Sequence, residues 1–212
     1  MLLQDPFEIV TTAVDGRILQ VLAGADSWFT IAQVWDLSRV RSRDQVRRVL
    51  ARLAGTGVLD VEQIATSYRY RLNRDHLGAG PIIDIATIRQ RLLQRLRTEF
   101  ESGNMAPCLV YAALFGSAAR GTMRRGSDID LFVVRSDQLP SGLGEEDWEA
   151  AVFELEHKVS RWTGNPANVL HMTESGVIRA GDTAALAEIR HDGVPLFGRS
   201  SWLTLALSRA AS

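Results

Sequence analysis

The chain has 212 residues, of which 46% are hydrophobic and 23% charged, a composition typical of a soluble globular protein with one large or two small domains. The formal net charge of −1 provides no overall attraction to nucleic acid, so any surface that binds it must be local. The single cysteine, Cys108, excludes an internal disulfide and lies in an apolar run typical of a buried thiol. No stretch of about 18 consecutive apolar residues occurs and the N-terminus lacks the pattern of a signal peptide, so we expect a cytoplasmic protein without a membrane span.

The first part of the chain is predicted to contain three helices. Apolar residues at helical spacing predict helices at residues 15–24 and 30–38. A third helix is expected to begin at Ser42, a favourable N-cap, and to end at Gly55. We therefore expect a small helical core before residue 56.

Two strand-like runs follow these helices, at residues 58–64 and 67–73, and the second alternates aromatic and basic residues. The order of three helices and two strands is similar to that of the winged helix-turn-helix domains. The resemblance implies that residues 42–55 form the recognition helix and residues 58–72 the wing.

Basic residues on the third helix and the wing indicate a DNA-binding surface. The helix is expected to bury its apolar residues, so its other face presents arginines suited to phosphate contacts and guanine readout. We expect double-stranded DNA to contact Arg43, Gln45, Arg47, Arg48, Arg69 and Arg71. The alternative is a protein–protein interaction module, because winged helices serve both purposes.

A linker and a long helix are predicted next. Residues 76–81, "HLGAGP", have linker composition, and residues 82–101 carry apolar residues at helical spacing. This helix is expected to pack on the second domain or to pair with its counterpart in a homodimer. We therefore divide the chain into a winged-helix domain at 1–75, a linker and amphipathic helix at 76–104, and a second domain at 105–212.

The second domain alternates strands and helices, which predicts an α/β (α+β) fold with a mixed sheet and flanking helices. Apolar runs typical of buried strands occur at residues 108–117, 128–134 and 167–172. Helical periodicity is found at residues 145–162, and a further helix is expected at 182–193.

Two carboxylates, Asp128 and Asp130, stand at positions i and i+2 of a predicted strand and should point to the same face. They would repel each other unless a divalent cation were bound, and Mg²⁺ prefers carboxylate and phosphate oxygens. Gly116 allows a close approach of backbone to phosphate, and Ser117 offers hydroxyl and amide donors. The segment also carries cationic groups for anionic oxygens, namely Arg120, Arg124 and Arg125. These residues predict a site for a metal-bound nucleoside triphosphate.

The segments "GSAARG" (116–121) and "GSDIDL" (126–131) resemble the motif of the DNA polymerase beta-like nucleotidyltransferase superfamily, and of its minimal members in particular, over roughly residues 108–172. The resemblance implies that Asp128 and Asp130 hold Mg²⁺ and are catalytic. It also implies that ATP or another nucleoside triphosphate binds Gly116, Ser117, Arg120, Arg124 and Ser127. A preceding winged helix resembles regulator-like nucleotidyltransferases of bacteria and archaea.

Active members of the superfamily usually have a third carboxylate on a later strand, and the aligned residue here is Asn168. His171 would face the site only if the strand register were shifted by one, and Glu174 is the nearest carboxylate downstream. Three functions stay open. The protein transfers a nucleoside monophosphate to a hydroxyl of a protein, nucleic acid or small molecule; or it is a transcriptional regulator whose second domain only binds nucleotide or dimerises; or it is an antitoxin-like protein with a protein target.

Overall fold

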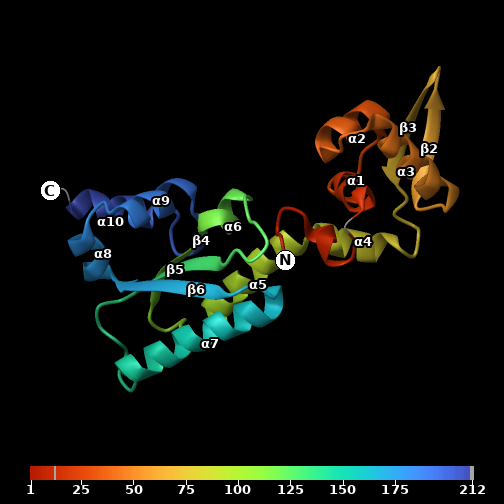
Figure 1. The fold of residues 1–212 in the computed structure, drawn as a ribbon. Helices are drawn as coiled ribbons and strands as arrows, with labels where there is room; N and C mark the ends of the chain where they lie inside the picture. The colour runs from red at the N-terminus through yellow and green to blue at the C-terminus, as the bar shows by residue number, and fades with distance from the viewer. Residues whose placement is uncertain (12, 211–212) are drawn as a thin grey trace. The chain divides into compact units, whose positions relative to one another are not determined.

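The chain folds into two compact units in the computed structural model, which describes residues 1–11 and 13–210. One unit is Leu2–Gln90, and the other begins at Arg91 and includes Met1. Figure 1 shows the helices and strands of both units. The boundary falls within the predicted linker-and-helix segment, residues 76–104, and divides it between the two units.

In the described residues of the first unit, three α-helices precede an antiparallel hairpin and a fourth follows it. Its elements are η1 (Pro6–Ile9), α1 (Val14–Ala23), β1 (Phe29–Thr30), α2 (Ile31–Ser38), α3 (Arg43–Gly55), β2 (Leu59–Ile64), β3 (Ser67–Leu72) and α4 (Ala79–Ala86). The hydroxyls of Thr30 and Ser42 accept backbone amides in the first turns of α2 and α3, and the cap at Ser42 is the one predicted from the sequence. The strands form one sheet in the order β1-β3-β2, with the short β1 added to the predicted hairpin.

The core of this unit lies between the helices and the inner face of the hairpin. Ile18, Val34, Val46, Leu50 and Leu72 are among its most buried side chains. The α3 residues expected to be buried, Val46, Val49, Leu50 and Leu53, all belong to it. The opposite side of α3 is therefore left to solvent.

The predicted single helix at residues 82–101 is two helices in the structure. Helix α4 ends before Thr87, and α5 spans Ile88–Ser102. Both the amide and the hydroxyl of Thr87 donate to the carbonyl of Ile83, and this pairing closes the end of α4. Part of the predicted linker, from Ala79 onward, is helical.

The second unit is built on a four-stranded mixed sheet in the order β6-β5-β4-β7. Its further elements are β4 (Leu109–Phe115), α6 (Gly116–Arg120), β5 (Ile129–Arg135), α7 (Glu145–Thr163), β6 (Ala167–Thr173), α8 (Glu174–Ala180), α9 (Ala184–Asp192), β7 (Val194–Phe197) and α10 (Trp202–Ala210). Strand β4 is antiparallel to β5 and β7, whereas β5 and β6 are parallel and joined through α7. The predicted mixed α/β architecture is confirmed.

Helices cover both faces of this sheet (Figure 1). Phe132 and Val134 of β5 point to a core that also contains Val177, Leu186 and Leu203, from α8, α9 and α10. Helix α7 lies on the other face, where the Trp148 indole N–H donates to His171 of β6. Cys108 is a buried free thiol, as predicted. Within the described residues, none of the helices combines the length and the apolarity that crossing a membrane requires.

Candidate nucleotide-binding site

Asp128 and Asp130 lie at the start of β5 and meet at a single amide group. Alternation along the strand directs Asp130 to the face of Phe132, the face that α9 covers. The side-chain amide of Asn168 donates to Oδ2 of Asp128 at 2.9 Å and to Oδ1 of Asp130 at 3.5 Å. Because β5 and β6 are parallel with Asp130 opposite Asn168, the sheet register itself brings these three side chains together.

A glycine bend lies directly against Asp130. Strand β4 ends at Phe115, opposite Asp130 in the antiparallel register, and Gly116 then opens α6 with a φ of 67°. A Cβ at Gly116 would collide with Oδ2 of Asp130, so this position requires glycine for its backbone conformation and for space. Ser117 follows, half-buried, and its carbonyl accepts the amides of Gly121 and Thr122.

The loop before Asp128 is closed by Ser127. Its hydroxyl accepts the backbone amide of Arg124 at 2.8 Å, and its amide donates to the Arg124 carbonyl at 2.9 Å. The Ser127 carbonyl accepts the side-chain amide of Asn165. The hydroxyl of Ser127 therefore shapes the loop that carries Asp128, while the Arg124 side chain is exposed beside it.

Arg120 is held by two acidic residues of α9. Its guanidinium forms an ion pair with Glu188 and a longer one with Asp192, at 3.5 Å. Sequence reasoning assigned Arg120 to phosphate and did not find these two partners. They lie about 70 residues downstream, and no motif or periodicity connects them to Arg120.

The electrostatic environment of the two aspartates favours a bound cation. Burial raises the pKa of Asp130, the hydrogen bond from Asn168 lowers it, and the charges of Asp128 and Glu188 raise it further. A cation of two charges would relieve this repulsion, and hard carboxylate oxygens suit Mg²⁺. The described residues include no group of three or more His, Cys, Asp or Glu side chains arranged for a metal ion. Two carboxylates, Asp128 and Asp130, are therefore the candidate protein ligands for a metal at this site.

Among residues 1–11 and 13–210, no carboxylate occupies the place of the usual third acid. Asn168 stands beside Asp130, as the sequence predicts for that register. His171 faces α7, where Trp148 donates to its Nδ1 at 3.1 Å, so the shifted register is wrong. Glu174 begins α8 after the far end of β6, six residues beyond Asn168 and roughly 20 Å along the strand direction. Glu174 is too far away to serve as the third group.

The predicted DNA-binding residues fall into two sets with different environments. Arg43, Arg47 and Arg48 of α3 are exposed, and Arg47 forms a 3.7 Å ion pair with Asp44. Gln45 is half-buried.

On the hairpin, Arg69 pairs with Glu62 and Arg71 with Asp60. Both guanidiniums also lie over the ring of Trp28, at 4.9 and 4.8 Å from its centroid. The hairpin arginines are thus engaged within their own unit, which alternation along the strand did not indicate.

Residues 90–164 match the family model described as the nucleotidyltransferase domain. This nucleotidyltransferase domain includes β4, the glycine bend, both aspartates and α7. The match confirms the nucleotidyltransferase part of the sequence prediction, and that family typically uses a nucleoside triphosphate and a divalent metal. The winged-helix assignment of the first unit stays a prediction.

Solved structures with some likeness to this chain include toxin–antitoxin proteins. One, a toxin-antitoxin with AMP-PNP, is 23% identical, with a TM-score of 0.39 over 57% of this chain and 83% of that chain. The MntA-HepT toxin-antitoxin is 19% identical, with a TM-score of 0.38 over 57% and 83% of the two chains. Likeness of this degree establishes neither a shared function nor a shared partner. No curated protein matched the chain.

Proposed function

We propose that the second unit binds a Mg²⁺-nucleoside triphosphate, with ATP as the first candidate, and transfers the nucleoside monophosphate to a hydroxyl acceptor. The observation that carries the proposal is the convergence of Asp128 and Asp130 on one amide, directly against the glycine bend at Gly116. The match to the nucleotidyltransferase domain supports the same reaction class.

Each residue of the site has a role in this proposal. Asp128 and Asp130 hold the metal, which when bound neutralises phosphate charge. The backbone at Gly116 and Ser117 receives the triphosphate, and Arg124 approaches it from the loop. The acceptor oxygen bonds to the α-phosphorus as the bond to the bridging oxygen breaks, and pyrophosphate leaves. The hydroxyl proton passes to solvent, because the amide of Asn168 cannot accept it.

The reaction is tested by measuring Mg²⁺-dependent pyrophosphate release from ATP, and from the other nucleoside triphosphates, with candidate acceptors present. We expect release from the wild type and none from Asp128→Asn plus Asp130→Asn. Asp182→Asn, an exposed aspartate paired with Arg190, is the matched control and should behave as the wild type. Equal release from the wild type and the double variant would reject the proposal.

The neutral Asn168 favours a second candidate for this domain, in which nucleotide is bound but not transferred. A transcriptional regulator or an antitoxin-like protein with a protein target would act in this way. A nucleotide-binding titration beside the release assay distinguishes the two candidates: binding that requires Asp128 and Asp130, without pyrophosphate release under any acceptor condition, supports the regulator. Pairing of the residue 82–101 segment in a homodimer also stays a proposal, tested by light scattering.

We further propose that the first unit is a winged helix that binds double-stranded DNA through α3. Support comes from the three exposed arginines on the side of α3 opposite its buried residues. Binding of labelled duplex DNA should weaken steeply with salt, because phosphate contacts release counterions. Arg43→Ala plus Arg47→Ala should weaken it further. Binding unaffected by both salt and this variant would support the protein–protein module instead.

A further inference from the structure

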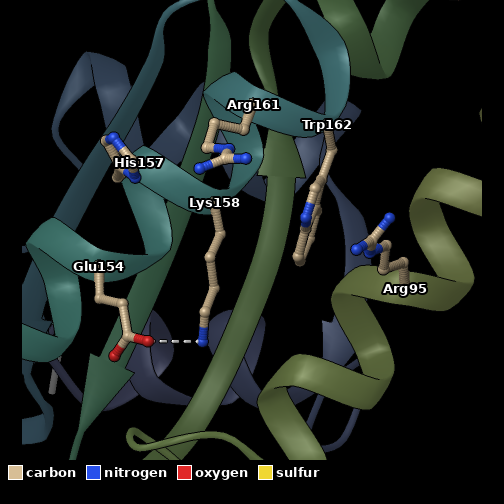
Figure 2. Close-up of a pocket in the computed structure, with 6 residues that line it drawn as sticks. All are labelled: Arg95, Glu154, His157, Lys158, Arg161 and Trp162. Carbon is tan, nitrogen blue, oxygen red and sulfur yellow. Dashed lines mark ion pairs between the residues drawn. The ribbon is translucent and has the colours of Figure 1, made fainter.

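A basic hollow lies between α5 and α7, on the face of the sheet opposite the two aspartates. It has a volume of about 500 Å³ and is lined by Arg95, Glu154, His157, Lys158, Arg161 and Trp162. Figure 2 shows these side chains, with Arg95 on α5 and the other five on α7. We call this surface the α5–α7 groove. The nucleotide site does not use it, because Asp130 points to the face covered by α9.

The basic side chains of the groove differ in whether they form ion pairs. Lys158 contacts Glu99 and Glu154, each at 2.9 Å, so its charge is satisfied within the unit. Arg95 and Arg161 have no carboxylate partner among the residues that the structure describes. Two exposed guanidiniums from different helices thus face one hollow without counter-ions, and guanidinium groups suit phosphate oxygens.

Aromatic side chains flank the cations of α7: Phe153 and His157 precede Lys158 and Arg161, and Trp162 follows them. The planar guanidinium of Arg95 lies over the ring of Trp162, 4.1 Å from the ring centroid. Two and a half turns earlier in α7, Phe153 is 70% exposed and stacks with His157 at an interplanar angle of 22°. Phe153, His157 and Arg161 are spaced four residues apart and therefore lie along one side of the helix.

We propose that the α5–α7 groove binds single-stranded nucleic acid. The phosphates contact Arg95 and Arg161, and unpaired bases stack on His157 and on Phe153, which lies beside the groove against His157. A basic groove combined with exposed aromatic rings is the arrangement that holds single strands without sequence preference. A duplex keeps its bases stacked inside and has no free ring faces to offer Phe153. The Glu154 carboxylate also lines the groove, and its pairing with Lys158 reduces its repulsion of phosphate.

The test is fluorescence anisotropy of labelled oligothymidylate and oligouridylate against the full chain, over a series of salt concentrations. Arg95→Glu plus Arg161→Glu should abolish measurable binding, whereas Arg95→Ala plus Arg161→Ala should reduce the salt slope by about 1.4, for two phosphate contacts. Phe153→Ala should weaken binding by about 5- to 150-fold, the range for loss of one stacked base.

Two control variants make the test specific. Arg199→Glu plus Arg209→Glu imposes the same change in net charge at exposed arginines outside the groove and should leave binding near the wild-type value. Arg43→Ala plus Arg47→Ala alters the proposed duplex-binding helix and should leave single-strand binding unchanged. Absence of single-strand binding by the wild type, or equal losses in groove and control variants, would overturn the proposal. Phe153 is exposed, so its variant provides a second test if charge reversal impairs folding.

Discussion

The amide of Asn168 occupies the position beside Asp130 from which a third carboxylate would act. Replacing Asn168 by Asp introduces a group that can accept the hydroxyl proton. General-base assistance is typically worth about 10²- to 10⁴-fold, so we expect Asn168→Asp to accelerate Mg²⁺-dependent pyrophosphate release by a factor in that range. Asn168→Ala removes the bridging amide without adding an acid and should show no acceleration. A variant Asn168→Asp that is no faster than the wild type would show that the proton has another acceptor.

Gly116 combines a left-handed backbone with contact to Asp130, whereas Gly126 has a similar φ of 82° and open space around it. Gly116→Ala and Gly126→Ala should therefore share a backbone cost of about 1–2 kcal/mol, seen in thermal unfolding. Only Gly116→Ala should also displace Asp130, with a loss of transfer on the order of 10²-fold. Equal activity of the two variants would contradict the placement of the bend against Asp130.

Asp137, just after β5, connects that strand to α8. Its carboxylate accepts the Ser175 amide at 3.0 Å, and the hydrogen bonds from Ser175 lower its pKa. A lowered folded-state pKa contributes stability above the ordinary pKa of the carboxyl group, and that contribution is lost as the pH falls through the lowered value. The wild type should therefore melt above Asp137→Asn at neutral pH, and the difference should shrink in acid. A difference that is constant with pH would mean that the charge of Asp137 is not involved.

At the scale of elements, α3 and the hairpin differ in how they use their arginines. Arg69 and Arg71 are paired with Glu62 and Asp60, so the hairpin presents little net charge to DNA. We expect Arg69→Ala plus Arg71→Ala to change duplex affinity much less than Arg43→Ala plus Arg47→Ala, in gel shifts at the same salt concentration. A larger loss from the hairpin pair would show that DNA competes successfully for these arginines.

The elements that sequence reasoning found are those with long, regular patterns. The periodicity of α3 and α7 and the apolar run of β5 identify them without any tertiary information. The break at Thr87 was missed because helical spacing of apolar residues continues through it, while the break itself depends on hydrogen bonds to Ile83. Strand β1 has only two residues, and no periodicity exists at that length.

At the candidate site, the motif predicted the residues that lie close in sequence, and tertiary contacts supplied the others. Asp128, Asp130 and Gly116 are brought together as their spacing indicates. The ion pair from Arg120 to Glu188, and the stacking of Arg69 and Arg71 on Trp28, join segments whose proximity only the fold determines. The position predicted for Asn168 agrees with the structure, where it lies opposite Asp130, because it rests on alignment to the family motif; alternation within one strand does not determine the pairing of two strands.

At the scale of the whole molecule, each of the two units contains a buried apolar cluster of its own. The proposals for DNA at α3, nucleotide at Asp128 and Asp130, and single strands at the α5–α7 groove therefore rest on different residues. Variants at one surface test that surface alone.

The most direct measurement is calorimetric titration of the full chain with ATP, in the presence of Mg²⁺ and in its absence. The proposed site predicts that ATP binds with Mg²⁺, that removal of the metal abolishes binding, and that Asp128→Asn plus Asp130→Asn does the same, while Asp182→Asn has no effect. ATP binding that is indifferent to the metal and to both aspartates would contradict it.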